Sequence, residues 1–116
     1  NNHPTYKLVV AANRDEFYQR KTAPASFWAE QPHILAGRDL EAQGTWLGMT
    51  KGGKISLLTN YRDPKHINPA APSRGQLVSD FLANGLSAEE YIREIAPIST
   101  QYNGFNLLAG TPDALW

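Results

Sequence analysis

The 116-residue sequence contains no cysteine, which excludes a disulfide framework, a zinc–thiolate site and a cysteine nucleophile within these residues. Neither charge is in surplus, because 11 lysine and arginine residues balance 11 aspartate and glutamate residues. General nucleic-acid and membrane-surface binders need surplus positive charge, so neither kind of partner is expected. The longest apolar run, Leu8 to Ala12, is too short to span a bilayer, so no membrane insertion is expected.

Apolar and aromatic residues are present in the amounts that a folded core requires. Hydrophobic residues make up 41% of the chain and include three tryptophans, five tyrosines and four phenylalanines, whereas disordered chains lack such residues. The length suits one domain or a piece of one. The first residues show no secretory signal pattern, so a cytoplasmic location is expected.

The pattern of apolar residues predicts an α+β fold. Residues 17–33 contain Pro24, Pro32 and the large aromatic residues Phe17, Phe27 and Trp28, and are expected to form an irregular connection. Since the expected strands do not alternate regularly with helices, we predict a mostly antiparallel sheet with helices packed on one face. The expected strands are 7–12, 34–39, 45–50, 54–60, 104–110 and a short one beginning near Ala114, with a Gly-Gly hairpin turn at 52–53.

Two helices are expected between the fourth and fifth of these strands. Ser73 and Gln76 have the spacing of a capping box, and so do Ser87 and Glu90. Asn84-Gly85 is expected to end the first helix in a left-handed conformation, and Pro97 to end the second.

Three familiar kinds of site are disfavoured by their context. Gly48 to Lys54 matches a phosphate-binding loop, but Ile55 replaces the required serine or threonine and a strand, rather than a helix, is expected to follow. The three histidines are isolated from one another, so no metal site is predicted. No serine stands in the G-x-S-x-G motif of a serine hydrolase.

Polar residues cluster directly after three of the expected strands and could meet at one rim of the sheet. Arginine and aspartate at such a rim often pair for purely structural reasons. Asparagine at a strand end can instead supply the neutral donor that an oxyanion hole requires. The sequence allows both the structural and the functional interpretation of the three clusters, which are Asn13-Arg14-Asp15, Arg38-Asp39 and Asn60-Tyr61-Arg62-Asp63.

From Ala12-Asn13-Arg14-Asp15-Glu16-Phe17 onwards the sequence resembles the NRDE family, also called the transport and Golgi organization protein 2 family. The resemblance implies that residues 1–116 are the N-terminal part of a single NRDE domain, without its first strand and its C-terminal portion. The blocks that carry it are 9–18, Thr22-Ala23-Pro24, 35–39, Gly44-Thr45-Trp46-Leu47-Gly48, 58–64, Ser73-Arg74-Gly75 and 102–107.

The family is in turn similar to the N-terminal-nucleophile hydrolases, in particular to the bile-salt and penicillin V acylases. This resemblance implies part of a four-layer αββα architecture and hydrolysis of a non-peptide carbon–nitrogen bond by an N-terminal cysteine that lies outside this chain. Asp15 is placed like the aspartate that orients the cysteine, and Asn60 like the asparagine of the oxyanion hole. The acylases carry an arginine three residues before their aspartate, whereas this sequence has Ala12 there and an arginine at 14.

The ligand is expected to be a small molecule, and two functional readings remain. The first is an amide hydrolase with Asp15 and Asn60 as catalytic residues and no cofactor. The second is a non-catalytic haem or lipid binding and trafficking protein on the same fold, with Phe27, Trp28 and Trp46 lining an apolar pocket instead of packing in the core. In either reading, the candidate binding residues are Asn13, Arg14, Arg38 and Arg62.

Overall fold

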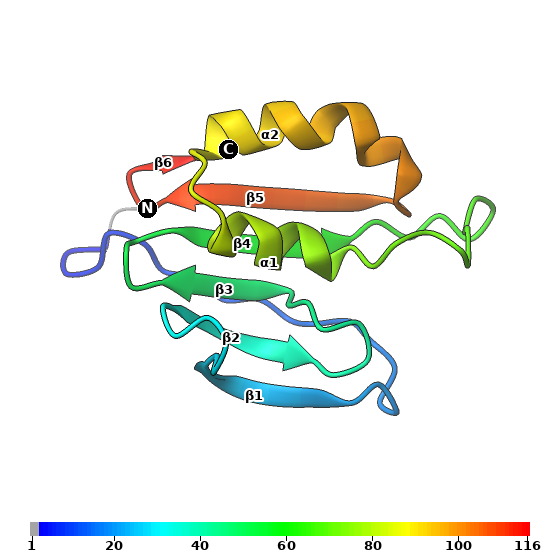
Figure 1. Ribbon diagram of the computed structural model, residues 1–116, viewed down its shortest axis with the longest axis horizontal. Coiled ribbons are helices and arrows are strands. Elements are labelled where there is room, and N and C mark those ends of the chain that lie inside the picture. Colours follow the sequence, from blue (N-terminus) through cyan, green and yellow to red (C-terminus); the bar gives the residue numbers. More distant parts are fainter. Residues whose placement is uncertain (1–2) are drawn as a thin grey trace.

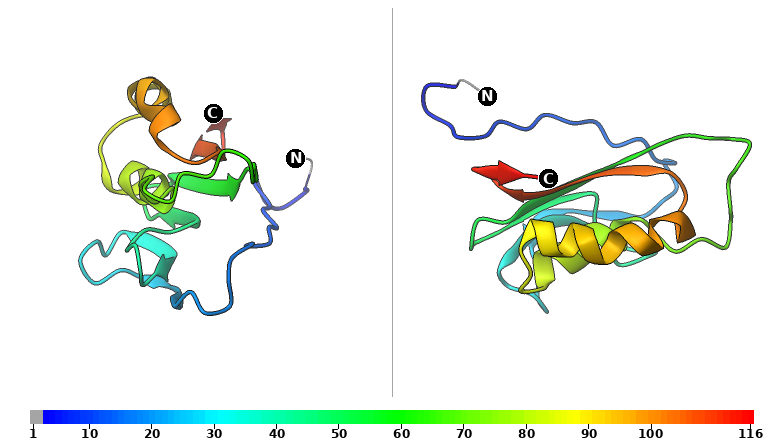
Figure 2. Two further views of the ribbon diagram at one scale, coloured as in Figure 1. Left: turned by 90° about the vertical axis from the view of Figure 1, so that its right-hand side faces the viewer. Right: turned by 90° about the horizontal axis from the view of Figure 1, so that it is seen from above.

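The computed structural model describes residues 3–116, which form one antiparallel sheet with two helices on one of its faces (Figures 1 and 2). The six strands lie in the sheet in their order along the chain. Their bounds are Thr22–Phe27 (β1), Ile34–Asp39 (β2), Leu47–Thr50 (β3), Ile55–Asn60 (β4), Phe105–Thr111 (β5) and Ala114–Leu115 (β6). The helices are Gly75–Ala83 (α1) and Ala88–Ile95 (α2), followed by the 3₁₀ helix Ala96–Gln101 (η1).

The α+β class and the antiparallel sheet covered by helices on one face are therefore confirmed. β4 pairs with β5 although both helices lie between them in the sequence, so the chain leaves the sheet, crosses one face and returns beside β4. The core lies between that face and the helices. Its most deeply buried large side chains are Phe81, Ile34, Leu82 and Val78.

The Gly-Gly hairpin forms where the sequence predicted it. Gly53 has a φ of 94°, which glycine adopts without the penalty that a Cβ would add. β3 and β4 pair antiparallel on either side of this turn. Because β4 follows the glycines, the amide cradle of a phosphate-binding loop, which needs a helix N-terminus, is not built here.

Two expectations for the N-terminal quarter are wrong. Residues 7–12 form no strand and are mostly exposed; Val9 retains 56% of its accessible surface, because none of the strands in residues 3–116 pairs with this segment. Residues 22–27, expected to be irregular, form β1. Pro24 fits because β1 is an edge strand and its pairing with β2 is interrupted between Ala23 and Ser26, where no ladder hydrogen bond is needed.

The two expected capping boxes have different outcomes. At α2, the Ser87 hydroxyl accepts a hydrogen bond from the Glu90 amide at 3.2 Å, and the Glu90 carboxylate accepts one from the Ser87 amide at 2.8 Å. At α1, the expectation is wrong, because Arg74 is the residue before the helix and already has helical backbone angles. The Gln76 side chain turns away and donates to the carbonyl of Ala42, which ties α1 to the loop between β2 and β3.

Ser87→Ala is expected to lower the free energy of unfolding by about 1 kcal/mol, because the amide of Glu90 loses its capping acceptor. Ser73→Ala, the same change at the unformed cap, is expected to stay within about 0.5 kcal/mol of the wild type. Urea titration followed by circular dichroism measures both. Equal losses would contradict the asymmetry between the two helix starts.

α1 ends at Ala83 without the left-handed residue that the sequence suggested. Asn84 is extended, with φ −83° and ψ 169°. The ammonium of Lys54, from the β3–β4 turn, donates to the carbonyls of Phe81 and Asn84 and to the Asn84 side chain, at 2.7–3.2 Å. A lysine at this position supplies donors for the free carbonyls and a charge that suits the negative end of the helix dipole. Burial lowers the pKa of Lys54.

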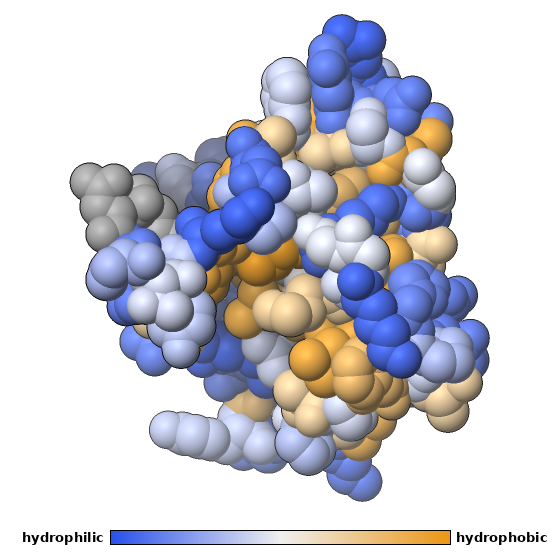
Figure 3. All heavy atoms as spheres, turned by 90° about the vertical axis from the view of Figure 1, so that its left-hand side faces the viewer, coloured by the Kyte–Doolittle hydropathy of each residue, from blue (hydrophilic) through white to orange (hydrophobic). Residues whose placement is uncertain are grey.

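No helix formed by residues 3–116 covers the other face of the sheet, which remains partly open. Strand pairing places Leu35 beside Met49 and Leu47 beside Leu57 on this face. Met49 retains 47% of its accessible surface and Phe27 51%. Residues 3–20 run along this side of the molecule (Figure 2), and hydrophobic side chains reach the surface in the end view of Figure 3.

Candidate functional site

A cavity of about 530 Å³ lies at the end of the sheet where β2 and β4 finish. Both strands run antiparallel to β3, so they run parallel to each other. Their last residues, Asp39 and Asn60, therefore lie at the same end of the sheet. The residues around this cavity come from the N-terminal segment, the ends of β2 and β4, the start of β3 and the loop before α1. The strand-end clusters singled out in the sequence therefore meet at one rim, apart from Arg38.

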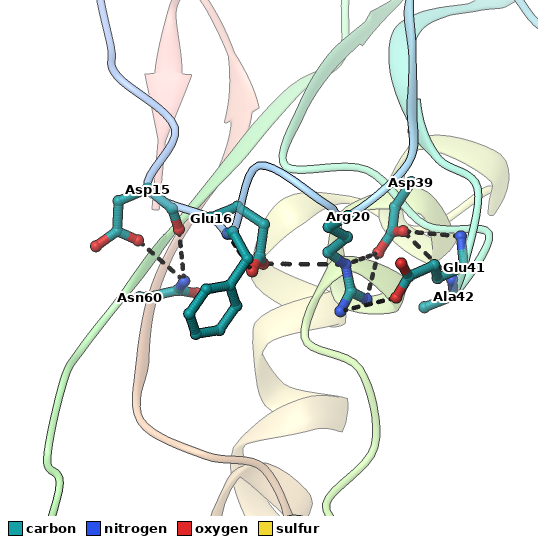
Figure 4. Close-up of polar contacts among 8 residues, drawn as sticks. Asp15, Glu16, Arg20, Asp39, Glu41, Ala42 and Asn60 are labelled. Atoms are coloured by element: carbon teal, nitrogen blue, oxygen red, sulfur yellow. Dashed lines mark hydrogen bonds and ion pairs between the residues drawn. The ribbon is translucent and has the colours of Figure 1, made fainter.

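Asp15 and Asn60 are in contact at this rim, as Figure 4 shows. The Asn60 side-chain amide donates to the Asp15 carboxylate at 3.3 Å and also approaches the Asp15 backbone carbonyl at 3.5 Å. The other Asp15 oxygen pairs with the Arg62 guanidinium at 2.8 Å. The Asp15 side chain retains 52% of its accessible surface, so it is open to a further partner.

Arg20 holds the neighbouring part of the cavity wall together (Figure 4). Its guanidinium donates to Asp39 at 2.7 and 3.1 Å and lies 3.9 Å from Glu16 and 3.5 Å from Glu41. The backbone amides of Glu41 and Ala42 also donate to Asp39. Arg20 therefore fixes the segment that carries Asp15 against the end of β2.

The electrostatics of this cluster follow from burial and pairing. Burial of the Asp39 carboxyl acts to raise its pKa, but the hydrogen bonds from Arg20 and from two backbone amides outweigh it and hold the pKa below its ordinary value. The hydrogen bond to Asp39 raises the pKa of Arg20, against the opposite effect of burial. Both groups are therefore charged at neutral pH, and the pair is a structural anchor with no proton to exchange.

Trp46 forms an aromatic wall of the cavity. Gly37 makes room for its ring, since a Cβ at position 37 would lie 2.7 Å from the indole. The guanidinium of Arg14 lies over this ring, 4.3 Å from its centroid. Trp46 therefore links β3 to the N-terminal segment by a cation–π contact.

The loop before α1 closes the cavity on the helix side. Gly44 and Gly75 touch, because a Cβ on Gly44 would lie 2.5 Å from the Gly75 carbonyl carbon, and the Thr45 amide donates to Gly75 at 3.3 Å. This contact brings Ser73 and Arg74 into the cavity lining. One guanidinium nitrogen of Arg74 donates to the Gly104 carbonyl at 2.7 Å.

A second cavity of about 410 Å³ adjoins the first and shares Asp15, Glu16, Asn60, Arg74 and Asn103 with it. Its outer wall is the loop after β4, which Asn103 fastens by accepting from the Asn68 amide and donating to the Asn68 carbonyl. The side chains of Asp15 and Asn60 therefore border both cavities.

Of the six residues singled out in the sequence, five surround these cavities. Asp15, Asn60, Asn13 and Arg14 line the larger cavity, and Arg62 lines the smaller one. Arg38 lies apart, since its guanidinium stacks on Trp28, 3.8 Å from the ring centroid, and pairs with Glu30. Alternation along β2 explains this placement, because residues 34, 36 and 38 share the helix-covered face.

The sequence reading missed Arg20, Ser73 and Arg74 and left the place of Trp46 open. Arg20 lies in the segment that was expected to be irregular, and Ser73 was assigned to a helix cap. Two of the family-like blocks already pointed to these residues. They contain Trp46 and Ser73-Arg74-Gly75, and their glycines allow the close contacts described above. Trp28, by contrast, is buried in the core, and Phe27 lies exposed on β1 away from the cavity lining.

Residues 3–116 contain neither a membrane-spanning helix nor a cluster of metal ligands. No helix in this part of the chain has the length and apolar character needed to cross a membrane. No three histidine, cysteine, aspartate or glutamate side chains within it are grouped as ligands of a metal ion.

Comparison with known proteins gives consistent similarities. A family model described as Transport and Golgi organisation 2 matches residues 1–115. The Transport and Golgi organization 2 homolog of Mus musculus is 45% identical over 107 residues, and the Homo sapiens homolog is 43% identical; each alignment covers 90% of this chain. The Drosophila melanogaster Transport and Golgi organization protein 2 is 34% identical over 116 residues. This chain spans only 38–40% of the length of these relatives.

Proposed function

Because the chain belongs to the Transport and Golgi organisation 2 family, we propose that its rim cavity is part of an amide-hydrolase site whose nucleophile is an N-terminal cysteine outside these residues. The family membership agrees with the NRDE resemblance of the sequence. The observation that supports the catalytic proposal is the contact between the Asp15 carboxylate and the Asn60 amide at the mouth of a cavity. A carboxylate and a neutral amide donor side by side are what such a reaction needs.

The chemistry assigns a different task to each group. An α-amine with a pKa of about 8 takes the thiol proton. The thiolate attacks the amide carbon, the carbon–nitrogen bond breaks, and the leaving amine takes that proton. Water then releases the acid from the thioester. Asn60 donates to the oxyanion formed in each step, and Asp15 holds the ammonium or amine of the cysteine.

In the described structure, Asp15 and Asn60 satisfy each other. The amide nitrogen of Asn60 is directed at two oxygens of Asp15, at 3.3 and 3.5 Å, and on this proposal it turns from Asp15 toward the oxyanion during the reaction. An incoming ammonium would attract the Asp15 carboxylate and free the Asn60 amide. The Asp15–Asn60 contact is, on this proposal, the resting arrangement of the site.

The four-layer αββα architecture is part of the same proposal. The sheet face opposite the helices carries half-buried leucines at positions 35, 47, 57 and 108. A second sheet packed on this face would bury them, as in aligned sheet packing. A cytoplasmic location likewise stays a prediction.

Asn60→Ala is expected to reduce amide hydrolysis by the complete native polypeptide by about 10²–10³-fold, the usual effect of removing an oxyanion donor. Its free energy of unfolding is expected to change by no more than about 0.5 kcal/mol, because Asn60 is half-exposed and its hydrogen bonds are long. Asn106→Ala, on the adjacent strand position, is the matched control. It removes a contact to Thr59 only and should leave the rate unchanged.

The release of primary amine from a panel of N-acyl compounds measures the rates, and urea titration measures stability. Replacing the N-terminal cysteine of the complete polypeptide by alanine should abolish turnover. Equal rates with and without that cysteine would reject the proposal. A stability loss of several kcal/mol in Asn60→Ala would instead identify Asn60 as a structural residue.

A second candidate is non-catalytic binding of haem or a lipid. The observation that favours it is the apolar part of the cavity lining, which combines Trp46 with leucines 47, 57 and 58. Titration of haem and of a fatty acyl conjugate, followed by tryptophan fluorescence, tests it through Trp46. The absence of saturable quenching with both ligands would count against it.

A further inference from the structure

Resting on the proposed function, we infer that the amide substrate carries a carboxylate, which Arg14 and Arg74 bind inside the larger cavity. The argument starts from the charges around the two adjoining cavities. Their linings hold four arginines and one histidine, and four carboxylates. Because these groups line two adjoining cavities, the way they pair decides which charge is left for a ligand.

Three of these four carboxylates have an arginine partner, and the fourth, Asp63, contacts a histidine ring. Glu16 and Asp39 pair with Arg20. Asp15 pairs with Arg62 at 2.8 Å, and Asp63 with the His66 ring at 2.6 Å. All four carboxylates are therefore engaged by side chains other than Arg14 and Arg74.

Arg14 and Arg74 are the cavity arginines that form no ion pair within residues 3–116. Both line the larger cavity. The guanidinium of Arg14 stacks on Trp46, a contact that uses the face of the guanidinium and leaves its N–H edges available. Arg74 uses one nitrogen for the Gly104 carbonyl, which fixes its position while other N–H donors remain.

Two guanidinium groups that line one cavity and form no ion pair within the described residues favour an anionic ligand there. A concave site with low-dielectric walls strengthens the field of its charges relative to an open surface. The guanidinium fork matches the two oxygens of a carboxylate or a phosphate. A carboxylate is the form that a small N-acyl compound such as an N-acyl amino acid carries.

The test compares two ligands of nearly the same shape with the complete native polypeptide. Hippurate (N-benzoylglycine) carries the carboxylate, and hippuramide (N-benzoylglycinamide) replaces it by a neutral amide. Calorimetric titration is expected to show hippurate binding at least about 10-fold more tightly, since hydrogen bonds to charged groups are the stronger ones. The preference should weaken as salt is added.

Arg14→Gln and Arg74→Gln are each expected to weaken hippurate binding by about 10-fold and to leave hippuramide binding unchanged. Arg93→Gln is the matched control, because Arg93 pairs with Glu89 on the surface of α2 and lies outside both cavities. Inorganic phosphate serves as a competing anion.

The outcomes separate this inference from the proposed function. Equal affinity for the two ligands, no binding of either, or tighter binding of phosphate than of hippurate overturns the inference. Charge-selective binding without turnover of any amide supports the carboxylate site and rejects the hydrolase. Turnover of hippuramide and hippurate with equal kcat/KM rejects the carboxylate site and leaves the hydrolase standing.

Discussion

Phe81→Ala is expected to lower the free energy of unfolding by about 3–5 kcal/mol, the usual cost of removing a buried phenylalanine ring. Phe81 retains 1% of its accessible surface and lies in the middle of α1, between the sheet and α2. Its ring packs against that of Tyr91 with centroids 5.3 Å apart, and Lys54 lies 4.5 Å from its centroid. Truncation therefore leaves a cavity in the core that the two helices cover.

Phe17→Ala is the matched control for this prediction. The same ring at position 17 retains 81% of its surface, so its removal should change stability by no more than about 0.5 kcal/mol. Urea unfolding followed by circular dichroism gives both values. Similar losses in the two variants would mean that α1 is not packed on the sheet as described.

Arg20→Met is expected to lower the free energy of unfolding by about 3 kcal/mol at pH 7, because it leaves the buried Asp39 carboxylate without its counter-charge. Asp39 retains only 6% of its accessible surface, while the Arg20 side chain retains 28%. Methionine keeps most of the aliphatic packing of arginine. The loss therefore reports on the ion pair and its hydrogen bonds rather than on side-chain volume.

The pH dependence of this loss has a defined sign. Although burial acts to raise the pKa of Asp39, its hydrogen bonds hold the net pKa below the unfolded value of about 3.9, so the pair stabilises the fold above that pH. The contribution is lost as the pH falls through the folded-state pKa. The difference between wild type and Arg20→Met should thus be largest near pH 7 and shrink toward pH 3.

Arg93→Met is the control for the Arg20 variant. Arg93 pairs with Glu89 on the exposed surface of α2, and such pairs contribute about 0.5 kcal/mol or less. Urea titrations at several pH values measure both variants. A pH-independent deficit in Arg20→Met would show that Asp39 is not the group responsible.

Local patterns in the sequence were sufficient for most of the fold. The hairpin at Gly52-Gly53 depends on residues adjacent in the chain, and the cap at Ser87 depends on a residue three positions later. β2 was predicted with the bounds it has in the structure, because an apolar run between polar segments is a local signal. The errors arose where tertiary contacts override that signal, as for residues 7–12, which lie outside the sheet, and the edge strand at 22–27.

The candidate site was only partly predictable. Asp15 and Asn60 could be proposed from the resemblance, but their contact joins residues 45 positions apart. The anchoring role of Arg20 required knowing that its segment lies against the end of β2. Arg38 was misplaced because its position after an apolar strand was considered without the alternation of residues 34, 36 and 38.

The sequence by itself determined the family, the α+β class, the hairpin and one helix cap, since each follows from residue types at short, fixed spacings. The tertiary structure alone decided which polar groups neutralise one another at the rim. Arg20 pairs with Asp39 and Arg62 pairs with Asp15. Arg14 forms no ion pair within residues 3–116 and stacks on Trp46. The reason is physical: charge pairing depends on distances across strands and loops, and strand register and the close contact of Gly44 with Gly75 set those distances.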